Sequence, residues 1–313
     1  MEPVRAWRRL RLTVAYDGSG FAGFAAQPGQ RTVSGVLAGA IAKVVGEPVA
    51  LTCAGRTDSG VHAWGQVVHS DVPTILRGGA LEPSRLARSC NSMLGPEVVV
   101  REASWAAPGF DARRSALSRA YRYQILCGPA ADPALAGLAW HLADALDVAA
   151  MHTATEAILG EHDFSAFCRR PPDGGSLVRR VLAAGWSSSE VRAGVLVRFD
   201  VEASSFCHQM VRSLVGTLIE VGRRRRPAGA MAQVLRGRDR AAAASPAPPQ
   251  GLCLWAVRYP EWCEAEPSTP EPSKPEPSEA EPSTPEPSTP EPSEAEPSAP
   301  PPSAPPPSAP EPS

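Results

Sequence analysis

Lysine is almost absent from this chain of 313 residues: Lys43 and Lys274 are the only two, and arginine supplies the rest of the 31 basic side chains. Long apolar runs are absent as well, and no stretch approaches the ~20 residues that a membrane-spanning helix needs. The N-terminal segment is basic but has neither an apolar core nor a cleavage site, so it does not match a secretory signal. We therefore expect a cytoplasmic protein with no membrane association.

The cysteines also show little organisation. There are seven, an odd number, and no two of them form a CxxC pair. A disulfide framework or a structural zinc site normally requires cysteines in recognisable pairs. The pattern predicts reduced thiols and no metal site.

The C-terminal segment differs in composition from the rest of the chain. Residues 264–313 contain 11 Glu and 19 of the 35 prolines, and no Leu, Ile, Val or aromatic residue. Such a segment cannot bury enough apolar surface to offset the entropy of ordering it, which predicts a disordered acidic tail. The tail carries a net charge of −10, which leaves +8 on residues 1–263. A basic body suggests an acidic partner, most simply nucleic acid bound through its phosphates, although arginine content can also follow from GC-rich coding.

Apolar spacing along the basic body predicts both helices and strands. Helical spacing is found at 32–45, 81–94, 143–159, 210–221 and 228–235. Strand patterns are found at 9–15, 49–53, 66–70, 98–104, 120–126, 178–186, 195–203 and 252–258. Strands often follow one another without a helix between them, which favours an α+β fold with a mostly antiparallel sheet. We expect two halves, 1–112 and 113–263, followed by the tail 264–313.

One glycine-rich loop carries residues suited to chemistry. Residues 54–63 read AGRTDSGVHA. An aspartate in such a turn most often accepts hydrogen bonds from its own backbone. Alternatively, Gly55 and Gly60 permit a tight backbone that presents the Asp58 carboxylate, with Arg56 beside it to hold a substrate anion. The residues alone leave both interpretations open.

A second group of candidates lies in the apolar helix predicted at 210–221. Arg212 interrupts this pattern, and an arginine buried in a core is costly unless it is paired. A carboxylate partner is therefore expected, with Asp58 as the candidate; a surface arginine with its stem along the helix is the alternative. The four arginines at 223–226 either hold RNA phosphates or form a solvated helix end, where cations suit the helix dipole.

An ordered series of segments across the basic body resembles the tRNA pseudouridine synthase A family. They are YDGSGFAGFAAQPGQRTVSGVL, AGRTDSGVHA with HAWGQVVH, RAYRYQI, EHDFSAFC, FCHQMVRSLVGTLIEVG and APPQGLCLWAVRYP. The order of these matches makes the resemblance specific, whereas any one of them would be weak. The chain departs from the family pattern at Ser59, Cys207, Gln209 and Ala25, and the acidic tail has no counterpart.

The resemblance implies a fold and a reaction. The fold would have two similar halves whose strands form one continuous sheet around a central basic cleft. The reaction would isomerise uridine to pseudouridine at positions 38 to 40 of the tRNA anticodon stem-loop, and the enzyme would act as a homodimer. The bond from N1 to C1′ breaks and C5 joins C1′, so no cofactor or external donor is needed.

The resemblance also assigns roles to particular residues. Asp58 corresponds to the catalytic carboxylate, which acts either as a nucleophile or as a base. The target base must leave its stack to reach Asp58. Arg56 is expected to fill the vacated space and steer the nucleotide, Tyr121 to stack on the uracil, and Arg212 to pair with Asp58. Tyr123 lies on the same strand face as Tyr121 and is the less favoured tyrosine.

Two other functions remain open at this stage. The first is a non-catalytic RNA-binding protein of the same fold, which would have no need for a buried carboxylate and its partner. The second is a hydrolase that uses Asp58 with His62, although a histidine in this position is more often structural.

Overall fold

The computed structural model describes residues 6–76, 78–169 and 174–263, which all belong to one compact unit spanning residues 1–268. The acidic tail predicted at 264–313 lies outside the described residues. Within the described ranges, no helix combines the length and the apolar character required to cross a lipid bilayer.

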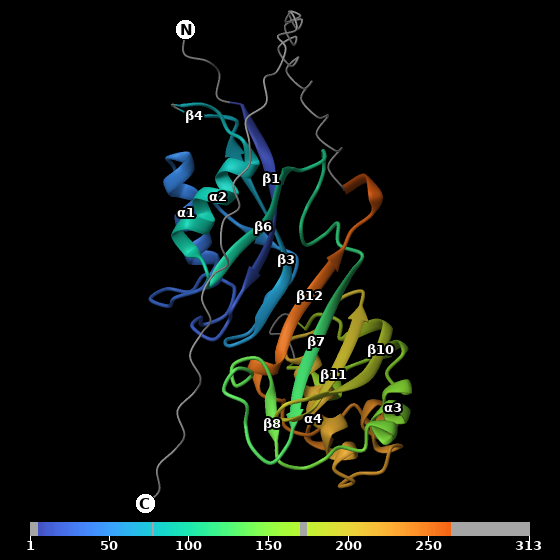
Figure 1. The fold of residues 1–313 in the computed structure, drawn as a ribbon. Coiled ribbons are helices and arrows are strands. Elements are labelled where there is room, and N and C mark those ends of the chain that lie inside the picture. Colours follow the sequence, from blue (N-terminus) through green and yellow to red (C-terminus); the bar gives the residue numbers. More distant parts are fainter. Residues whose placement is uncertain (1–5, 77, 170–173, 264–313) are drawn as a thin grey trace, which may run out of the picture. The chain divides into compact units, whose positions relative to one another are not determined.

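A single sheet of ten strands organises the described chain (Figure 1). Its order is β6 (Val98–Trp105), β1 (Trp7–Tyr16), β3 (His62–Pro73), β12 (Leu252–Arg258), β7 (Ser118–Cys127), β11 (Gly194–Ala203), β10 (Val178–Val191) and β9 (Gly160–Asp163), with β2 (Thr52–Cys53) beside β3 and β8 (Trp140–Leu142) beside β7. The short strands β4 (Ile75–Leu76) and β5 (Gly79–Ala80) pair separately. Among the strand pairs of the described residues, only β3–β12 and β7–β8 are parallel. The prediction of an α+β fold with a mostly antiparallel sheet is confirmed.

The last strand of the described chain lies in the middle of this sheet. On one edge of β12, Cys253 and Leu254 pair in parallel with His62 and Ala63 of β3. On its other edge, β12 pairs in antiparallel with β7. The strands that precede and follow residue 112 therefore form one continuous sheet, as the resemblance implied, while the division at this residue remains a prediction.

Five α-helices accompany the sheet in the described residues: α1 (Val33–Val45), α2 (Pro83–Leu94), α3 (Val148–Glu156), α4 (Met210–Gly222) and α5 (Ala230–Gly237). Thr32 caps α1 by accepting a hydrogen bond from the Gly35 amide, and Gly46 ends the helix with a φ of 85°. The prediction of one long helix over 143–159 was wrong at both ends. Asp147 caps α3 through the Ala150 amide, and β9 begins at Gly160.

Helices and sheet share one apolar core. Every second side chain of β1, at Leu10, Leu12 and Val14, is fully or almost fully buried. Figure 1 shows α1 and α2 beside β1, and α3 and α4 beside β10 and β11. Tyr121 of β7 faces the same core as Leu254 of β12, and alternate side chains of the two strands point to the opposite face. This arrangement places the loop between β2 and β3 next to the first turn of α4.

Candidate active site

The glycine-rich loop between β2 and β3 is held by buried polar side chains. Gln66 is fully buried, and its amide Nε2 donates a 2.6 Å hydrogen bond to the carbonyl of Gly55. The hydroxyls of Tyr16 and Thr57 lie 2.8 Å apart, and the Phe24 amide donates to the Thr57 carbonyl at 3.1 Å. Because these contacts come from β1, β3 and the segment before α1, the backbone on both sides of Arg56 is fixed by the fold.

Only one of the two glycines singled out in this loop has a backbone that requires glycine. Gly60 has a φ of +76°, in the left-handed region that favours glycine. Gly55 is not in that region, and a Cβ built on it would meet only the Tyr121 hydroxyl at an ordinary 3.8 Å. The expectation for Gly60 is confirmed, whereas the conformational argument for Gly55 was wrong.

An N-terminal turn packs directly against the same loop. A Cβ built on Gly18 would lie 2.0 Å from the carbonyl oxygen of Val61, so the two backbones are in close contact. His62 is buried; its Nδ1 accepts a 3.1 Å hydrogen bond from the Gly18 amide and lies 3.2 Å from Asp17 Oδ1. These contacts assign His62 to the support of the turn and favour the structural interpretation over a catalytic pair with Asp58.

Replacing Gly18 with alanine is expected to lower the free energy of unfolding by about 1–3 kcal/mol, because the new methyl group would displace the backbone of Val61. The displacement would reach the adjacent loop and reduce pseudouridine formation by about tenfold or more. Denaturant unfolding and product analysis measure the two effects. As a control, alanine at exposed Gly39 of α1, where no atom lies within 4 Å, should be neutral or stabilise by up to ~1 kcal/mol; equal behaviour of the two variants would contradict the close contact.

The Asp58 carboxylate is contacted on both oxygens. Nη1 of Arg212 donates a hydrogen bond to Oδ2 at 3.3 Å, and Nε2 of His208 lies 3.3 Å from Oδ1. The side chains of Asp58 and Arg212 are 25% and 15% exposed, and Arg212 also donates through Nε to the Ala247 carbonyl at 2.7 Å. The predicted partner of the arginine on the apolar helix is therefore confirmed. In an Asx turn the carboxylate would accept a hydrogen bond from a nearby backbone amide. The Asp58 oxygens instead contact the side chains of Arg212 and His208.

His208 was missed by the sequence reasoning. It lies four residues before Arg212, and its side chain is half exposed. The residue between it and α4, Gln209, has a φ of +63°, which is uncommon for a residue other than glycine. The spacing of four residues between His208 and Arg212 was the available signal, because residues four apart share one face of a helix. However, α4 begins only at Met210, so this periodicity could not place His208 beside the carboxylate.

The two tyrosines of β7 have different surroundings. Tyr123 is fully buried, and its hydroxyl donates to the Pro248 carbonyl at 2.8 Å, which makes it a core residue. Tyr121 packs edge-on against Phe206, with ring centroids 5.0 Å apart. A Cβ built on Gly55 would lie 3.8 Å from the Tyr121 hydroxyl, so the phenol lies beside the glycine-rich loop. Burial and then the negative charge of Asp58 raise the pKa of Tyr121 above its ordinary value, and the phenol stays protonated.

The other arginines predicted to contact RNA differ in whether they form hydrogen bonds or ion pairs within the protein. Arg56 is exposed and makes no hydrogen bond or ion pair with another residue in the described part of the chain. The run 223–226, in contrast, is engaged within the protein. Its contacts are Arg223 with Asp144 (3.3 Å), Arg224 with Asp147 (3.1 Å), Arg225 with Glu220 (3.4 Å) and Arg226 with the Ala242 carbonyl (2.6 Å). The helix-end interpretation of this run is favoured.

A buried arginine next to Tyr121 connects the loop to the later strands. Arg119 is 8% exposed and donates five hydrogen bonds to the carbonyls of four residues, Ala54, Arg113, Ala116 and Ser204, at 2.7–3.2 Å. None of these acceptors is a carboxylate, and burial lowers the pKa of Arg119. Its planar fork therefore joins three backbone segments that carry or flank site residues.

These residues define a class of site: a carboxylate held by a guanidinium between a glycine-rich loop and the start of an apolar helix, with a protonated tyrosine close by. Such a site is suited to nucleophilic or general-base chemistry. A family model described as tRNA pseudouridine synthase matches residues 154–260.

Proteins named tRNA pseudouridine synthase A are similar over most of the chain. The protein from Frankia casuarinae is 48% identical over 256 residues, which cover 80% of this chain and 89% of the relative. Those from Ralstonia nicotianae and Shouchella clausii are 41% and 39% identical over 258 and 252 residues, covering 81% and 80% of this chain and 90% and 93% of the relatives. The chain belongs to the tRNA pseudouridine synthase A family and is an isomerase that converts uridine to pseudouridine.

Proposed function

We propose that this isomerase acts on uridines 38 to 40 in the anticodon stem-loop of tRNA, with Asp58 as its catalytic carboxylate. The observation that carries the proposal is the contact between Asp58 and Arg212, two residues 154 positions apart in the chain that the fold brings together at a partly exposed position. A non-catalytic RNA-binding protein would gain nothing from a carboxylate held in this way.

The contacts of Asp58 suggest which of its oxygens reacts. Oδ2 is held by Arg212, whose side chain is mostly buried, whereas Oδ1 is contacted by the half-exposed His208. An incoming ribose can displace an exposed imidazole more easily than a buried guanidinium with a second hydrogen bond. We therefore assign Oδ1 as the oxygen that approaches the nucleotide, either to attack C1′ or to remove a proton from the ribose.

The remaining site residues bind the nucleotide in this proposal. Because burial and Asp58 keep the Tyr121 phenol protonated, it cannot serve as the base, and its ring is assigned to stacking on the flipped uracil. The exposed Arg56 is free to occupy the space that the base leaves or to contact a phosphate. During the reaction C5 loses a proton and N1 gains one, and every other atom is retained, so the chemistry requires no metal or cofactor.

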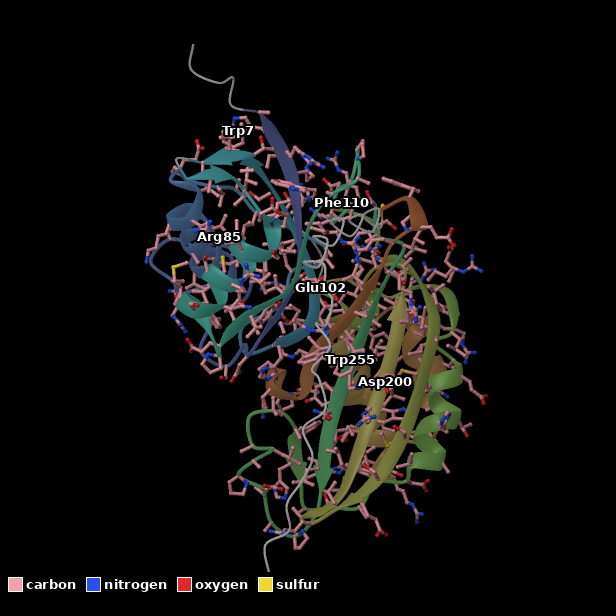
Figure 2. All side chains as sticks on the ribbon, turned by 45° about the horizontal axis from the view of Figure 1, so that its top comes forward. Trp7, Arg85, Glu102, Phe110, Asp200 and Trp255 are labelled. Carbon is pink, nitrogen blue, oxygen red and sulfur yellow. The ribbon has the colours of Figure 1, made fainter. Side chains whose placement is uncertain are left out.

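We also propose that the protein is a cytoplasmic homodimer, with the second copy on the sheet face that carries Trp64 and Trp255. These side chains are 47% and 38% exposed and stack with centroids 6.1 Å apart. Arg101 lies over Trp64 at 4.1 Å and Arg122 over Trp255 at 3.8 Å. Exposed aromatic and arginine side chains gathered in one patch are typical of protein interfaces. Figure 2 labels Trp255 on this patch, with Asp200, the ion-pair partner of Arg122, close by.

Sedimentation velocity tests the dimer. The wild-type protein is expected to sediment as a dimer and Trp255→Glu as a monomer, because the substitution removes the stacked apolar ring and would bury a charged group in the interface. A monomeric wild type, or a dimer that survives both Trp255→Glu and Trp64→Glu, would show that this face is not the interface.

The substrate assignment is tested with tRNAs that contain uridine at only one of positions 38, 39 and 40. We expect the wild-type enzyme to form pseudouridine in each of these tRNAs and none in a tRNA that lacks all three uridines, as read by position-specific mapping and nucleoside mass spectrometry. Conversion at other positions alone would reject the anticodon assignment. Tight binding without any conversion would favour the RNA-binding alternative.

A further inference from the structure

The segment between β6 and β7 contains a turn with two adjacent exposed arginines, Arg113 and Arg114. Oδ1 of Asp111 closes the turn by accepting hydrogen bonds from the backbone amides of both arginines at 2.8 Å. The Ser115 amide donates to the Asp111 carbonyl at 2.9 Å, and the Ser115 hydroxyl accepts from the Asp111 amide at 3.0 Å. The backbone conformation of the turn is therefore maintained by its own residues.

Side chains of the sheet and of the segment after β12 fix this turn to the fold. Ala112 is fully buried; its amide donates to Nδ1 of His69 on β3 at 2.9 Å, and its carbonyl accepts from the Tyr259 hydroxyl at 2.6 Å. The Arg113 carbonyl accepts a 2.7 Å hydrogen bond from Arg119 of β7. All of these bonds use backbone groups of the turn, so its two guanidinium groups play no part in holding it.

The turn lies against the start of the glycine-rich loop. Nη2 of Arg119 donates both to the Arg113 carbonyl at 2.7 Å and to the Ala54 carbonyl at 2.9 Å, so the two backbones are close together. Ala54 and Ala112 also belong to the same small apolar cluster. Since Arg56 follows Ala54 by two residues, the exposed arginines of the turn and Arg56 lie on neighbouring backbone segments.

The guanidinium groups of Arg113 and Arg114 are not used within the protein. In the ranges that the structure describes, neither side chain makes a hydrogen bond or an ion pair with another residue. Oδ1 of Asp111, their acidic neighbour in the turn, is occupied by the two backbone amides. A rigid turn that presents two unused arginine forks is suited to bind phosphate groups, since the planar fork matches a phosphate in two hydrogen bonds.

We propose that Arg113 and Arg114 form a binding site for the RNA backbone phosphates that flank the target uridine; the identity of these phosphates rests on the proposed placement of that uridine at Asp58. Drawing a nucleotide out of its stack costs free energy, and phosphate contacts close to the flipped nucleotide supply part of it. Arg56 then remains available for the space that the base leaves. The two arginines are positioning residues and take no part in making or breaking bonds.

The test compares the full-length double variant Arg113→Gln/Arg114→Gln with the wild type in binding to full-length tRNA, measured by fluorescence anisotropy at a series of salt concentrations. We expect binding at low salt to weaken by about tenfold or more, and the slope of log Kd against log salt to fall by about 1 to 2, because up to two phosphate contacts are lost. Glutamine leaves every backbone hydrogen bond of the turn in place, so the midpoint of urea unfolding should not change.

A matched control is available on α2. Arg85 and Arg88 are also exposed, lie about one helical turn apart, and make no side-chain ion pair in the part of the chain that the structure describes. Figure 2 labels Arg85 apart from Phe110, which lies just before the turn. Arg85→Gln/Arg88→Gln removes the same net charge and should change tRNA affinity by less than about threefold. Equal losses in the two double variants would show that only net charge matters and would overturn the proposal.

Neutral linkages identify the phosphates that are bound. A methylphosphonate linkage carries no charge, and one is placed in turn at each linkage near the uridine that the enzyme converts. At one or more of these linkages, the substitution should weaken binding to the wild type by about threefold or more and leave binding to Arg113→Gln/Arg114→Gln unchanged. If every neutral linkage weakens both proteins equally, the two arginines do not contact these phosphates.

Single-turnover kinetics separates this role from catalysis. The tRNA concentration that gives half the maximal rate should rise by about tenfold or more in Arg113→Gln/Arg114→Gln, a larger factor than any fall in the rate at saturation. A fall in the saturating rate with an unchanged half-saturating concentration would contradict the phosphate site. If Asp58→Asn kept full activity, the proposed function would fail, whereas the binding and salt measurements would still report on the two arginines.

Discussion

Asp58→Asn is expected to reduce pseudouridine formation by at least ~10³-fold while leaving the fold intact. The asparagine amide has the size of the carboxylate, and its oxygen can still accept the hydrogen bond from Arg212, but it can neither attack C1′ nor remove a proton. The mostly buried Arg212 keeps an oxygen acceptor and its bond to the Ala247 carbonyl but loses its counter-charge, so the free energy of unfolding should fall by about 1–3 kcal/mol. Single-turnover kinetics with tRNA and denaturant unfolding measure the two quantities.

A matched control is available on β3. Asp71 also pairs with an arginine, at 2.8 Å from Arg9, and its side chain is 52% exposed. Asp71→Asn should leave activity unchanged, because this carboxylate has no part in the proposed site. If Asp58→Asn retained activity within about tenfold of the wild type, Asp58 would not be the catalytic carboxylate, since loss of a positioned base or nucleophile costs more than that.

Arg119→Met is expected to have the largest effect on stability. The substitution keeps an apolar stem but leaves the carbonyls of Ala54, Arg113, Ala116 and Ser204 without their donor, and each buried unsatisfied group costs roughly 1–3 kcal/mol. Methionine carries no charge, so the variant no longer pays the desolvation cost of the buried guanidinium, which offsets part of the lost stability. We expect the free energy of unfolding to fall by about 3 kcal/mol or more, together with a lower activity because Ala54 begins the catalytic loop.

Arg258→Met is the control for this prediction. Arg258 ends β12, its side chain is 69% exposed, and it pairs with Glu202 at 2.8 Å. A pair with an exposed arginine contributes roughly 0–1 kcal/mol. Thermal or urea unfolding that gave equal losses for both variants would show that Arg119 does not join the segments as described.

The sequence predicted the elements whose local signals agree. The helix at 210–221 has a strong apolar pattern and no proline, and α4 covers Met210–Gly222. Its interior glycine, Gly216, does not end the helix and lies in close contact with the Ser245 backbone. The prediction of a helix over 143–159 failed at its boundaries although its alanines favour a helix. Asp147 caps α3 within the predicted range, and Gly160, with a φ of +90°, starts a strand soon after the helix ends at Glu156. Local pattern is informative where propensity, capping and burial point to the same boundary, and it fails where they compete.

The sequence itself determined the basic body, the acidic tail, the mixed fold class and the expectation that Arg212 needs a carboxylate, because each follows from composition, periodicity or the cost of burying a charge. Only the tertiary structure decided that His208 contacts Asp58, that Arg119 joins three backbone segments, and that β12 lies between β3 and β7. These contacts join residues that are far apart in the chain or lie outside a regular helix. Their proximity depends on strand pairing across the whole sheet, which no local pattern encodes.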